Sequence, residues 1–373
     1  MIFCPLNWYA EESIEQQRGE HSLSRMRFSN PDSVPTEHTM AHFKRWRKER
    51  ANKLKLKDYS YVVPQVAPNL DYLHANRIEP SITWIGHSTF LIQHSGVNIV
   101  TDPVWSGRMA FQKRLAPPGI PLTDMPPIDM VLISHSHYDH LSITSLRRLA
   151  GDKQLLVPAG LKNKLRLKGF LRVREFHWWE SATINGLTFT FVPSQHWTRR
   201  TPWDMNRSHW GGWIIEPSPE LARKQDADLR QQGLKSIAGA NDEAPSPALQ
   251  SEGGRPVLTD NPTLYFAGDS GYFNGFKEIG SRFKIDIAML PIGAYEPEWF
   301  MGPQHVTPEQ ALQAFVDTGA SWFVPMHYGA FKLADDTPRE ALDRLESGRR
   351  QQRIEEERLV ILPHGETWRL HGR

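Results

Sequence analysis

Four potential metal ligands lie within six residues of one loop of this sequence: His135, His137, Asp139 and His140. Imidazole nitrogens and carboxylate oxygens are typical zinc donors in proteins. A catalytic zinc site keeps one position open for water, so three imidazoles and a carboxylate are more than one ion needs. We therefore expect two neighbouring metal ions here, in preference to a histidine-rich polar loop that binds nothing specific.

The residues in front of this loop must hold it in place. Residues 128–133 (Ile-Asp-Met-Val-Leu-Ile) are nearly all apolar and follow Pro126 and Pro127. A short, almost continuous apolar run bounded by prolines is typical of a strand buried on both faces. The loop therefore begins at the carboxyl end of a predicted strand.

Three further apolar runs end in residues that can bind a metal. His196 follows the run 187–193, Asp269 follows 263–267, and His327 follows 322–326. Ligand sites of α/β proteins form where strand ends meet at one edge of a sheet, so we expect these residues to join the cluster. Asp269 suits a bridging position because a carboxylate has two oxygens. The candidate metal ligands are His135, His137, Asp139, His140, His196, Asp269 and His327.

Other polar residues near predicted strand ends have two open interpretations each. His87, between the predicted strands 81–85 and 89–93, is either a site residue or a structural turn residue. Asp102 follows the predicted strand 97–100 and either forms a turn or supports a ligand. Arg199 and Arg200 follow His196 and either meet a phosphate group or solvate a loop.

The composition is that of an ordinary globular protein. The 373 residues are 39% hydrophobic and 23% charged, and the net charge of +2 gives no reason to expect a nucleic-acid partner. Cys4 is the only cysteine, which excludes an intrachain disulfide and a zinc finger. No apolar run reaches about 18 residues and no signal-peptide pattern is present, so we expect a cytoplasmic protein.

Alternating strand and helix patterns predict an α/β fold. We expect an N-terminal extension over residues 1–70, loosely ordered to about residue 40, and a main domain over 71–373 with a surface insertion at 217–262. Residues 43–57 carry eight cations and one acid. This stretch predicts either a basic helix on an anionic membrane surface or a solvated helix that covers one edge of the domain.

Several local patterns predict single elements in the second half of the chain. Thr307-Pro308-Glu309-Gln310 predicts a helix start by its capping pattern. The other predicted elements are helices near 220–232 and 339–350 and a strand over 358–362.

The motifs together resemble the metallo-β-lactamase superfamily, in which HxHxDH is followed by a distal His, a bridging Asp and a last His. Within it, the sequence resembles the N-acylphosphatidylethanolamine-hydrolysing phospholipase D family. The matching stretches are residues 126–129, 135–141, 193–197, 266–269 and above all 291–301 and 304–306.

This resemblance implies a four-layer αββα sandwich and two Zn²⁺ ions per chain. His135, His137 and His196 would hold one ion, Asp139, His140 and His327 the other, and Asp269 would bridge them. His305 matches a family position near the substrate head group. The candidate catalytic residues are therefore Asp139, Asp269 and His305.

The implied reaction releases phosphatidate and N-acylethanolamine from N-acylphosphatidylethanolamine by a metal-bridging hydroxide, with water or His305 protonating the departing alkoxide. The implied partners are a phospholipid substrate and a membrane surface, which the protein would contact peripherally. The resemblance is also compatible with a homodimer, although no residue of the sequence indicates one. One alternative is a metal-dependent lactonase, carboxylic-ester or other phosphodiester hydrolase, because zinc polarises a carbonyl as readily as a phosphoryl group. A non-catalytic, metal-stabilised lipid-binding protein is disfavoured, since a structural site has no reason to keep open positions.

Overall fold

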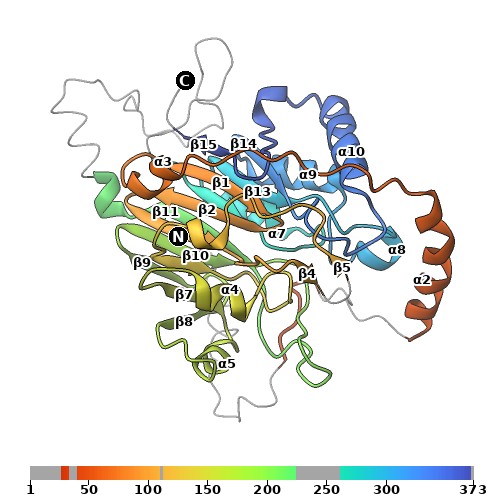
Figure 1. The fold of residues 1–373 in the computed structure, drawn as a ribbon, viewed down its shortest axis with the longest axis horizontal. Helices are drawn as coiled ribbons and strands as arrows, with labels where there is room; N and C mark the ends of the chain where they lie inside the picture. Colours follow the sequence, from red (N-terminus) through yellow and green to blue (C-terminus); the bar gives the residue numbers. More distant parts are fainter. Residues whose placement is uncertain (1–26, 33–39, 110–111, 224–260, 371–373) are drawn as a thin grey trace, which may run out of the picture.

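The computed structural model describes residues 27–32, 40–109, 112–223 and 261–370. Two twisted sheets, one of seven strands and one of six, form the centre of the molecule (Figure 1). In spatial order, the first sheet contains β15 (Thr367–Arg369), β1 (Ser81–Gly86), β2 (Thr89–His94), β3 (Val97–Thr101), β6 (Met130–Leu132), β7 (Gln154–Pro158) and β8 (Val173–Phe176). The second contains β14 (Trp322–Met326), β13 (Ile287–Pro291), β12 (Leu264–Phe266), β11 (Gly212–Pro217), β10 (Leu187–Val192) and β9 (Ser181–Ile184).

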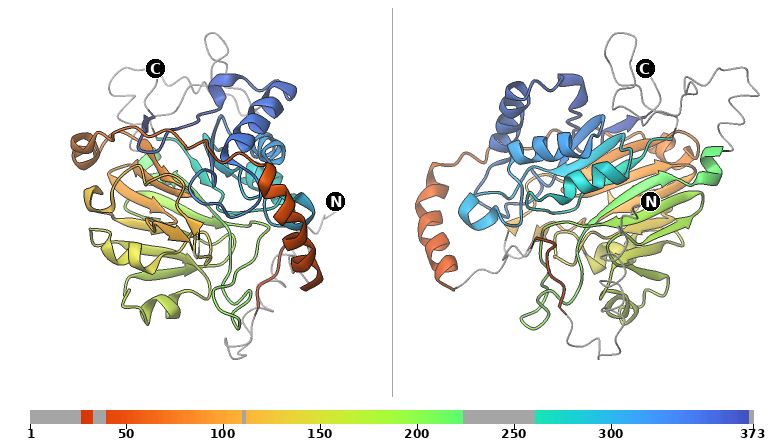
Figure 2. Two further views of the ribbon diagram at one scale, coloured as in Figure 1. Left: turned by 45° about the vertical axis from the view of Figure 1, so that its right-hand side comes forward. Right: turned by 180° about the vertical axis from the view of Figure 1, so that it is seen from behind.

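Helices cover the outer face of each sheet (Figures 1 and 2). The first sheet is covered by α3 (Leu70–Ala75), α4 (Ile143–Arg148) and α5 (Lys162–Arg166), and the second by α7 (Gly275–Arg282), α9 (Pro308–Thr318) and α10 (Pro338–Gln351). The remaining described elements are α2 (Met40–Lys53), α8 (Glu298–Met301), the hairpin β4 (Arg108–Met109) and β5 (Gln112–Lys113), and the 3₁₀ turns Leu54–Leu56, Leu122–Asp124 and Glu356–Arg358. The predicted four-layer αββα sandwich is confirmed.

Strand β6 shows why the metal loop is held firmly. Met130 and Leu132 point into the core between the two sheets, whereas Val131 packs in the outer cluster with Leu146 of α4 and Leu165 of α5. β6 also pairs in parallel with β3 on one side and β7 on the other. Both of its faces and both of its edges are therefore occupied, as the apolar run predicts.

Helix α9 begins where its sequence predicts. Thr307 accepts a hydrogen bond from the Gln310 backbone N–H, and the Gln310 side chain accepts one from the Thr307 N–H, which makes a capping box with Pro308 in the first turn. The helix ends at Gly319, whose φ of 66° suits glycine. Just before this start, the Val306 N–H donates to the Ser270 carbonyl at 2.8 Å, which holds His305 and Val306 beside the segment that follows β12.

The predicted strand over 358–362 is wrong. Only Leu359 forms a bridge, to Phe323 at the edge of the second sheet, and the chain then crosses to the first sheet, where β15 pairs with β1. The apolar side chain of Leu362 is buried in the core without extending a strand ladder, and Pro363 has no N–H to donate to one.

Two expectations fall largely on residues that the structure does not describe. Most of the predicted helix near 220–232 and of the insertion at 217–262 falls in residues 224–260, which lie outside the described residues. Residues 1–26 and 33–39 of the N-terminal extension lie outside them as well. Within the described ranges, no helix combines the length and the apolar character needed to cross a lipid bilayer.

Candidate metal centre

The first group of donors consists of three histidines from the loops that follow β6 and β10. His135 Nε2 lies 2.9 Å from His137 Nδ1, and His196 Nε2 lies 3.2 Å from the same atom. Zinc–nitrogen bonds of about 2.0–2.1 Å in a tetrahedral site put two donors roughly 3.3 Å apart, close to these separations. The three side chains are therefore placed to face one ion.

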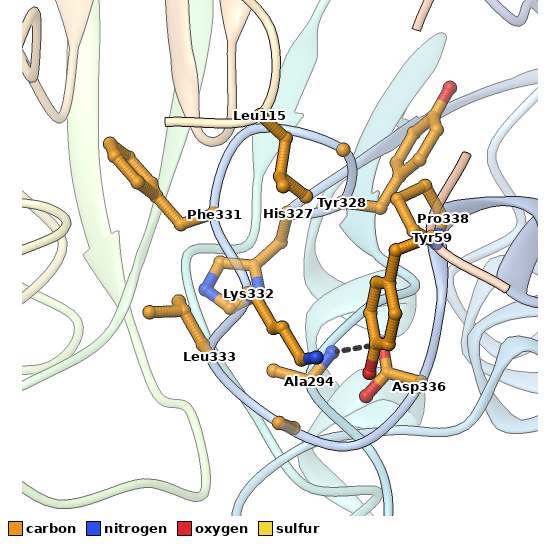
Figure 3. A pocket seen from close by; sticks show the side chains of 12 residues that line it. Tyr59, Leu115, Ala294, His327, Tyr328, Phe331, Lys332, Leu333, Asp336 and Pro338 are labelled. Carbon is orange, nitrogen blue, oxygen red and sulfur yellow. Dashed lines mark hydrogen bonds between the residues drawn. The ribbon is translucent and has the colours of Figure 1, made fainter. Parts of the chain in front are cut away.

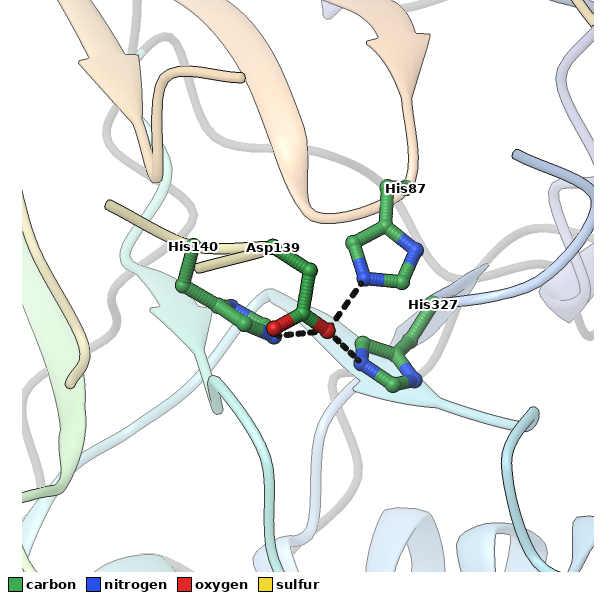
Figure 4. A group of neighbouring side chains, drawn as sticks. All are labelled: His87, Asp139, His140 and His327. Carbon is green, nitrogen blue, oxygen red and sulfur yellow. Dashed lines mark hydrogen bonds and ion pairs between the residues drawn. The ribbon is translucent and has the colours of Figure 1, made fainter. Parts of the chain in front are cut away.

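The second group gathers around Asp139 (Figure 4). Its Oδ2 atom lies 3.5 Å from His140 Nε2, 3.6 Å from His327 Nε2 and 3.1 Å from His87 Nε2. These side chains come from the loop after β6, the end of β14 and the turn between β1 and β2. His87 is thus a neighbour of the site, and of its two interpretations the geometry favours the site residue.

Asp269, after β12, lies between the two groups. Its Oδ2 atom is 3.0 Å from His327 Nε2 and 3.1 Å from His140 Nε2, and it is also 3.9 Å from His135 Nε2 and 3.8 Å from His196 Nε2. All seven predicted ligands therefore converge on one place. His305 lies at its edge, with Nδ1 4.0 Å from the same Asp269 oxygen.

The donor atoms fit metal ions because protein groups leave several of them unsatisfied. Asp269 Oδ1 and the Nε2 atoms of His140 and His327 are buried and have no aligned hydrogen-bond partner among the described residues. A buried polar atom without a partner is costly, and metal coordination would remove that cost. Donors of this kind, without a thiolate, suit Zn²⁺.

Asp102 supports the centre from behind. Its carboxylate accepts hydrogen bonds from His140 Nδ1 at 2.7 Å, from the Ser134 backbone N–H at 2.7 Å and from the Ser134 hydroxyl at 2.5 Å. Because Nδ1 keeps its hydrogen in this bond, the Nε2 atom of the neutral His140 ring has none and can bind a metal. The geometry favours the supporting role over that of a simple turn residue.

His196 is oriented by two contacts that sequence analysis missed. Its Nδ1–H donates to the carbonyl of Gln304 at 3.0 Å, and its backbone N–H donates to Asn30 Oδ1, also at 3.0 Å. Asn30 belongs to the N-terminal extension and accepts a second bond from Trp210 Nε1. A lone Asn far away in sequence gives no signal of such a role.

The two donor groups differ in their protonation. Burial lowers the pKa of His137 to about 4 and those of His135 and His196 well below the usual value, so these rings are neutral near pH 7. Burial acts on His140 and His327 too, but nearby carboxylates, Asp269 foremost, raise the pKa of His327 to about 9 and that of His140 well above its usual value. Without metal, the second group therefore holds protons that an ion must displace.

Arg200 anchors the loop that carries the metal ligands, a role beyond the two predicted for it. Its guanidinium donates to the carbonyls of Ser136 at 2.7 Å and Leu141 at 2.9 Å, and it lies 4.1 Å above the Tyr138 ring. Both carbonyls belong to the loop that carries the metal ligands. Arg200 therefore fastens this loop to the segment after β10.

The loop after β14 is fastened in a similar way (Figure 3). Asp336 accepts hydrogen bonds from the backbone N–H groups of Ala294, at 3.0 Å, and Glu296, at 3.3 Å. Lys332 of the same loop lies 3.5 Å above the ring of Tyr59. His327 stands at the start of this loop with a φ of 63°, a strained conformation for a residue with a side chain.

A cavity of about 770 Å³ opens directly over the donor cluster. His137, Asp139, Asp269 and His305 line its floor. Its walls are mostly apolar and carry two cations; they include Phe43, Trp46, Met109, Tyr138, Leu141, Ile143, Trp197, Phe300, Met301 and Leu333, with Arg108 and Arg200. The site can therefore receive a substrate with an apolar part and an anionic group.

Comparison with known proteins gives a family match. The sequence model of a beta-lactamase superfamily domain matches residues 97–222 and 254–328, more than half of the chain. The solved structure of a metallo hydrolase from the archaeon Ignicoccus hospitalis superimposes with a TM-score of 0.52 over 79% of this chain and 99% of its own, at 22% identity.

Two relatives are similar over most of this chain. The N-acyl-phosphatidylethanolamine-hydrolyzing phospholipase D 1 of Caenorhabditis elegans is 31% identical over 314 residues, which are 78% of this chain and 76% of the relative. The mitochondrial N-acyl-phosphatidylethanolamine-hydrolyzing phospholipase D of Saccharomyces cerevisiae is 29% identical over 70% of this chain and 51% of its own length.

Proposed function

This chain belongs to the beta-lactamase superfamily and, within it, to the family of N-acylphosphatidylethanolamine-hydrolysing phospholipases D, and we propose that it hydrolyses N-acylphosphatidylethanolamine to phosphatidate and an N-acylethanolamine. It is a metal-dependent hydrolase. The names of the worm and yeast relatives support the choice of substrate. The observation that carries the proposal is the apolar cavity over the donor cluster, because a lipid needs both an apolar wall and a centre for its phosphate.

We assign two zinc ions to the seven donors. His135, His137 and His196 would hold one, Asp139, His140 and His327 the other, and Asp269 would be shared. When bound, such a pair supplies Lewis acidity, which activates water and neutralises the charge of a phosphodiester.

The residues around the ions position the reaction. Asp102 and the Gln304 carbonyl fix the hydrogens of His140 and His196 at Nδ1, so that their Nε2 atoms face the centre. Burial lowers the pKa of His305 to about 4, which makes the ring neutral in the free protein. A phosphodiester anion beside it would raise that pKa, and the protonated ring could then give a proton to the departing alkoxide.

We further propose that the protein binds the periphery of anionic bilayers. Helix α2, whose Phe43 and Trp46 line the cavity, carries the exposed cations Lys44, Arg45, Arg47 and Lys48. A neighbouring groove, which shares Tyr138 and Arg200 with the cavity, is lined by the highly exposed Leu167 and Trp203 and by Lys168. Exposed apolar side chains among cations are typical of membrane-surface sites.

Flotation with vesicles that contain phosphatidylserine should recover the protein, and added salt should release it. Equal recovery with neutral vesicles would contradict the proposed binding to anionic bilayers.

The proposed reaction is tested by product analysis. Zinc-loaded protein is incubated with N-acylphosphatidylethanolamine vesicles, beside Asp139→Asn and the exposed control Asp343→Asn, and the products are identified by mass spectrometry. Phosphatidate and N-acylethanolamine are expected from the wild type and from Asp343→Asn alone. If zinc is bound and neither product forms, the substrate proposal is wrong, and lactone and small phosphodiester substrates are assayed instead.

A further inference from the structure

Helix α2 precedes the matched superfamily region, yet it lies beside α8 (Figures 1 and 2) and contributes two side chains to the cavity over the metal centre. The Trp46 ring stacks on Phe300 with centroids 5.4 Å apart and planes 6° from parallel. Phe43 meets the edge of the same ring at 5.3 Å. α2 is thus packed on α8 through aromatic side chains.

Polar contacts fix the angle of α2. Arg50 forms an ion pair of 3.0 Å with Asp335, whose side chain is almost fully buried, and Trp46 Nε1 donates to the same carboxylate at 3.3 Å. Trp299 Nε1 donates to Glu49 at 3.0 Å, and Arg45 lies 4.1 Å above the Trp299 ring. Asp335 lies in the loop after His327 and Trp299 lies in α8, so α2 is tied to two segments that border the site.

These contacts make α2 a wall of the cavity and not only a cover for the edge of the domain. Phe43 and Trp46 line the cavity together with Phe300 and Met301, and the donor cluster lies on its floor. Ile143, the first residue of α4, also lines the cavity. A substrate bound at the metal centre therefore has the α2 aromatics beside it.

We propose that Phe43 and Trp46 are specificity-determining residues that hold a single long acyl chain of the substrate. The inference rests on the proposed function, in which the chain would be the one on the amide nitrogen. The diacylglycerol part can stay in the bilayer, whereas the N-acyl chain leaves with the alcohol product and needs an apolar surface near the scissile bond. A cavity of about 770 Å³ falls in the size range that encloses one small ligand.

Photo-crosslinking tests the location without requiring turnover. Zinc-loaded full-length protein is irradiated with N-palmitoylethanolamine that carries a diazirine at the end of its chain, and labelled peptides are mapped by mass spectrometry. We expect label on peptides that contain Phe43 or Trp46, and competition by unlabelled N-palmitoylethanolamine. Label on Leu165 or Trp203, in the neighbouring groove lined by α5 and the 200–207 segment, or label that is not competed, would overturn the proposal.

Chain-length preference tests the role. The ratio of kcat/KM for N-palmitoyl over N-butanoyl phosphatidylethanolamine is measured for the wild type, Trp46→Ala and Phe43→Ala, with the exposed neighbour Arg47→Ala as matched control. The ratio should fall about tenfold in both aromatic variants, the scale at which apolar pockets discriminate chains. An unchanged ratio in both, with circular dichroism unchanged, overturns the proposal. If the wild type cleaves neither lipid, the proposed function is wrong. The crosslinking result alone then decides whether Phe43 and Trp46 contact an acyl chain.

Discussion

At the scale of single residues, the side chains behind the ligands decide how the ligands can act. Asp102 fixes the hydrogen of His140 on Nδ1 and also takes both donors of Ser134. Asp102→Asn replaces one accepting oxygen by an NH₂ group, which can only donate. It therefore leaves one of the donors from His140 and Ser134 without an acceptor. We predict a 10- to 100-fold loss of zinc affinity, the usual range for such supporting residues, measured by competition with a chelator.

The control for this change is Asp152→Asn. Asp152 is an exposed aspartate whose ion pair with Arg172 lies at the surface, so its loss should leave zinc affinity unchanged. Equal affinity of Asp102→Asn and wild type would remove Asp102 from the centre.

His305 is predicted to serve the reaction more than the metal. Its ring lines the cavity floor, and its Nδ1 lies 4.0 Å from Asp269. His305→Gln should therefore retain zinc, read by elemental analysis, while turnover of N-acylphosphatidylethanolamine falls about 100-fold or more, as for loss of a general acid or base. His74→Gln, at an exposed helix position, is the control. Loss of zinc in His305→Gln would make His305 a ligand, and unchanged turnover would exclude it from the reaction.

At the scale of elements, the site depends on loops that other segments hold in place. Nη1 of Arg200 donates to three carbonyls of the ligand loop, while the planar guanidinium lies over the Tyr138 ring. Lysine keeps the charge but has no planar group to lie over this ring and hold the donor in place, so Arg200→Lys should lower zinc affinity about tenfold. Arg199→Lys, which alters a side chain that bonds only within its own turn among the described residues, should not. Identical affinities of the two variants would show that the loop needs no such anchor.

Elements with local signals could be predicted from the sequence. The apolar run before His135 and the capping pattern at Thr307 are read from a few neighbouring residues, and both elements form as expected. The run 358–362 has the composition of a strand, but whether it extends a ladder depends on where the chain goes next, which composition does not record.

The candidate site could be predicted from the sequence only in part. Its seven proposed ligands could be found because each follows an apolar strand. Other site residues act through contacts between segments that are distant in sequence: Arg200, Asn30 and the α2 aromatics. The residues next to them in sequence therefore do not indicate these roles.

At the scale of the whole molecule, metal binding should be linked to pH. The pKa of His327 is raised from 6.5 to about 9 and that of His140 is also raised, so both rings carry protons in the metal-free protein near pH 7. Zinc requires neutral rings and must displace these protons. Apparent zinc affinity should therefore rise with pH, about tenfold per unit for each proton released, and level off near pH 9.

Calorimetric titration with zinc in two buffers of different ionisation enthalpy measures the protons released. Release of one to two protons per chain is expected at pH 7. No release is expected at a pH above the pKa values of both His140 and His327. The stabilisation by charged His327 is present below pH 6.5 and lost as pH rises through about 9, so the metal-free protein should become less stable over this window. No proton release at pH 7 would mean that both rings are neutral before the metal binds.

We propose above all that the metal centre of this protein directs water to the phosphorus of a lipid phosphodiester. The most direct test is hydrolysis of N-acylphosphatidylethanolamine by the zinc-loaded protein in oxygen-18 water, with both products analysed by mass spectrometry. One heavy oxygen in the phosphate group of phosphatidate, and none in the N-acylethanolamine, is the predicted result. Heavy oxygen in the N-acylethanolamine or in a released fatty acid would place the attack at carbon and contradict the claim.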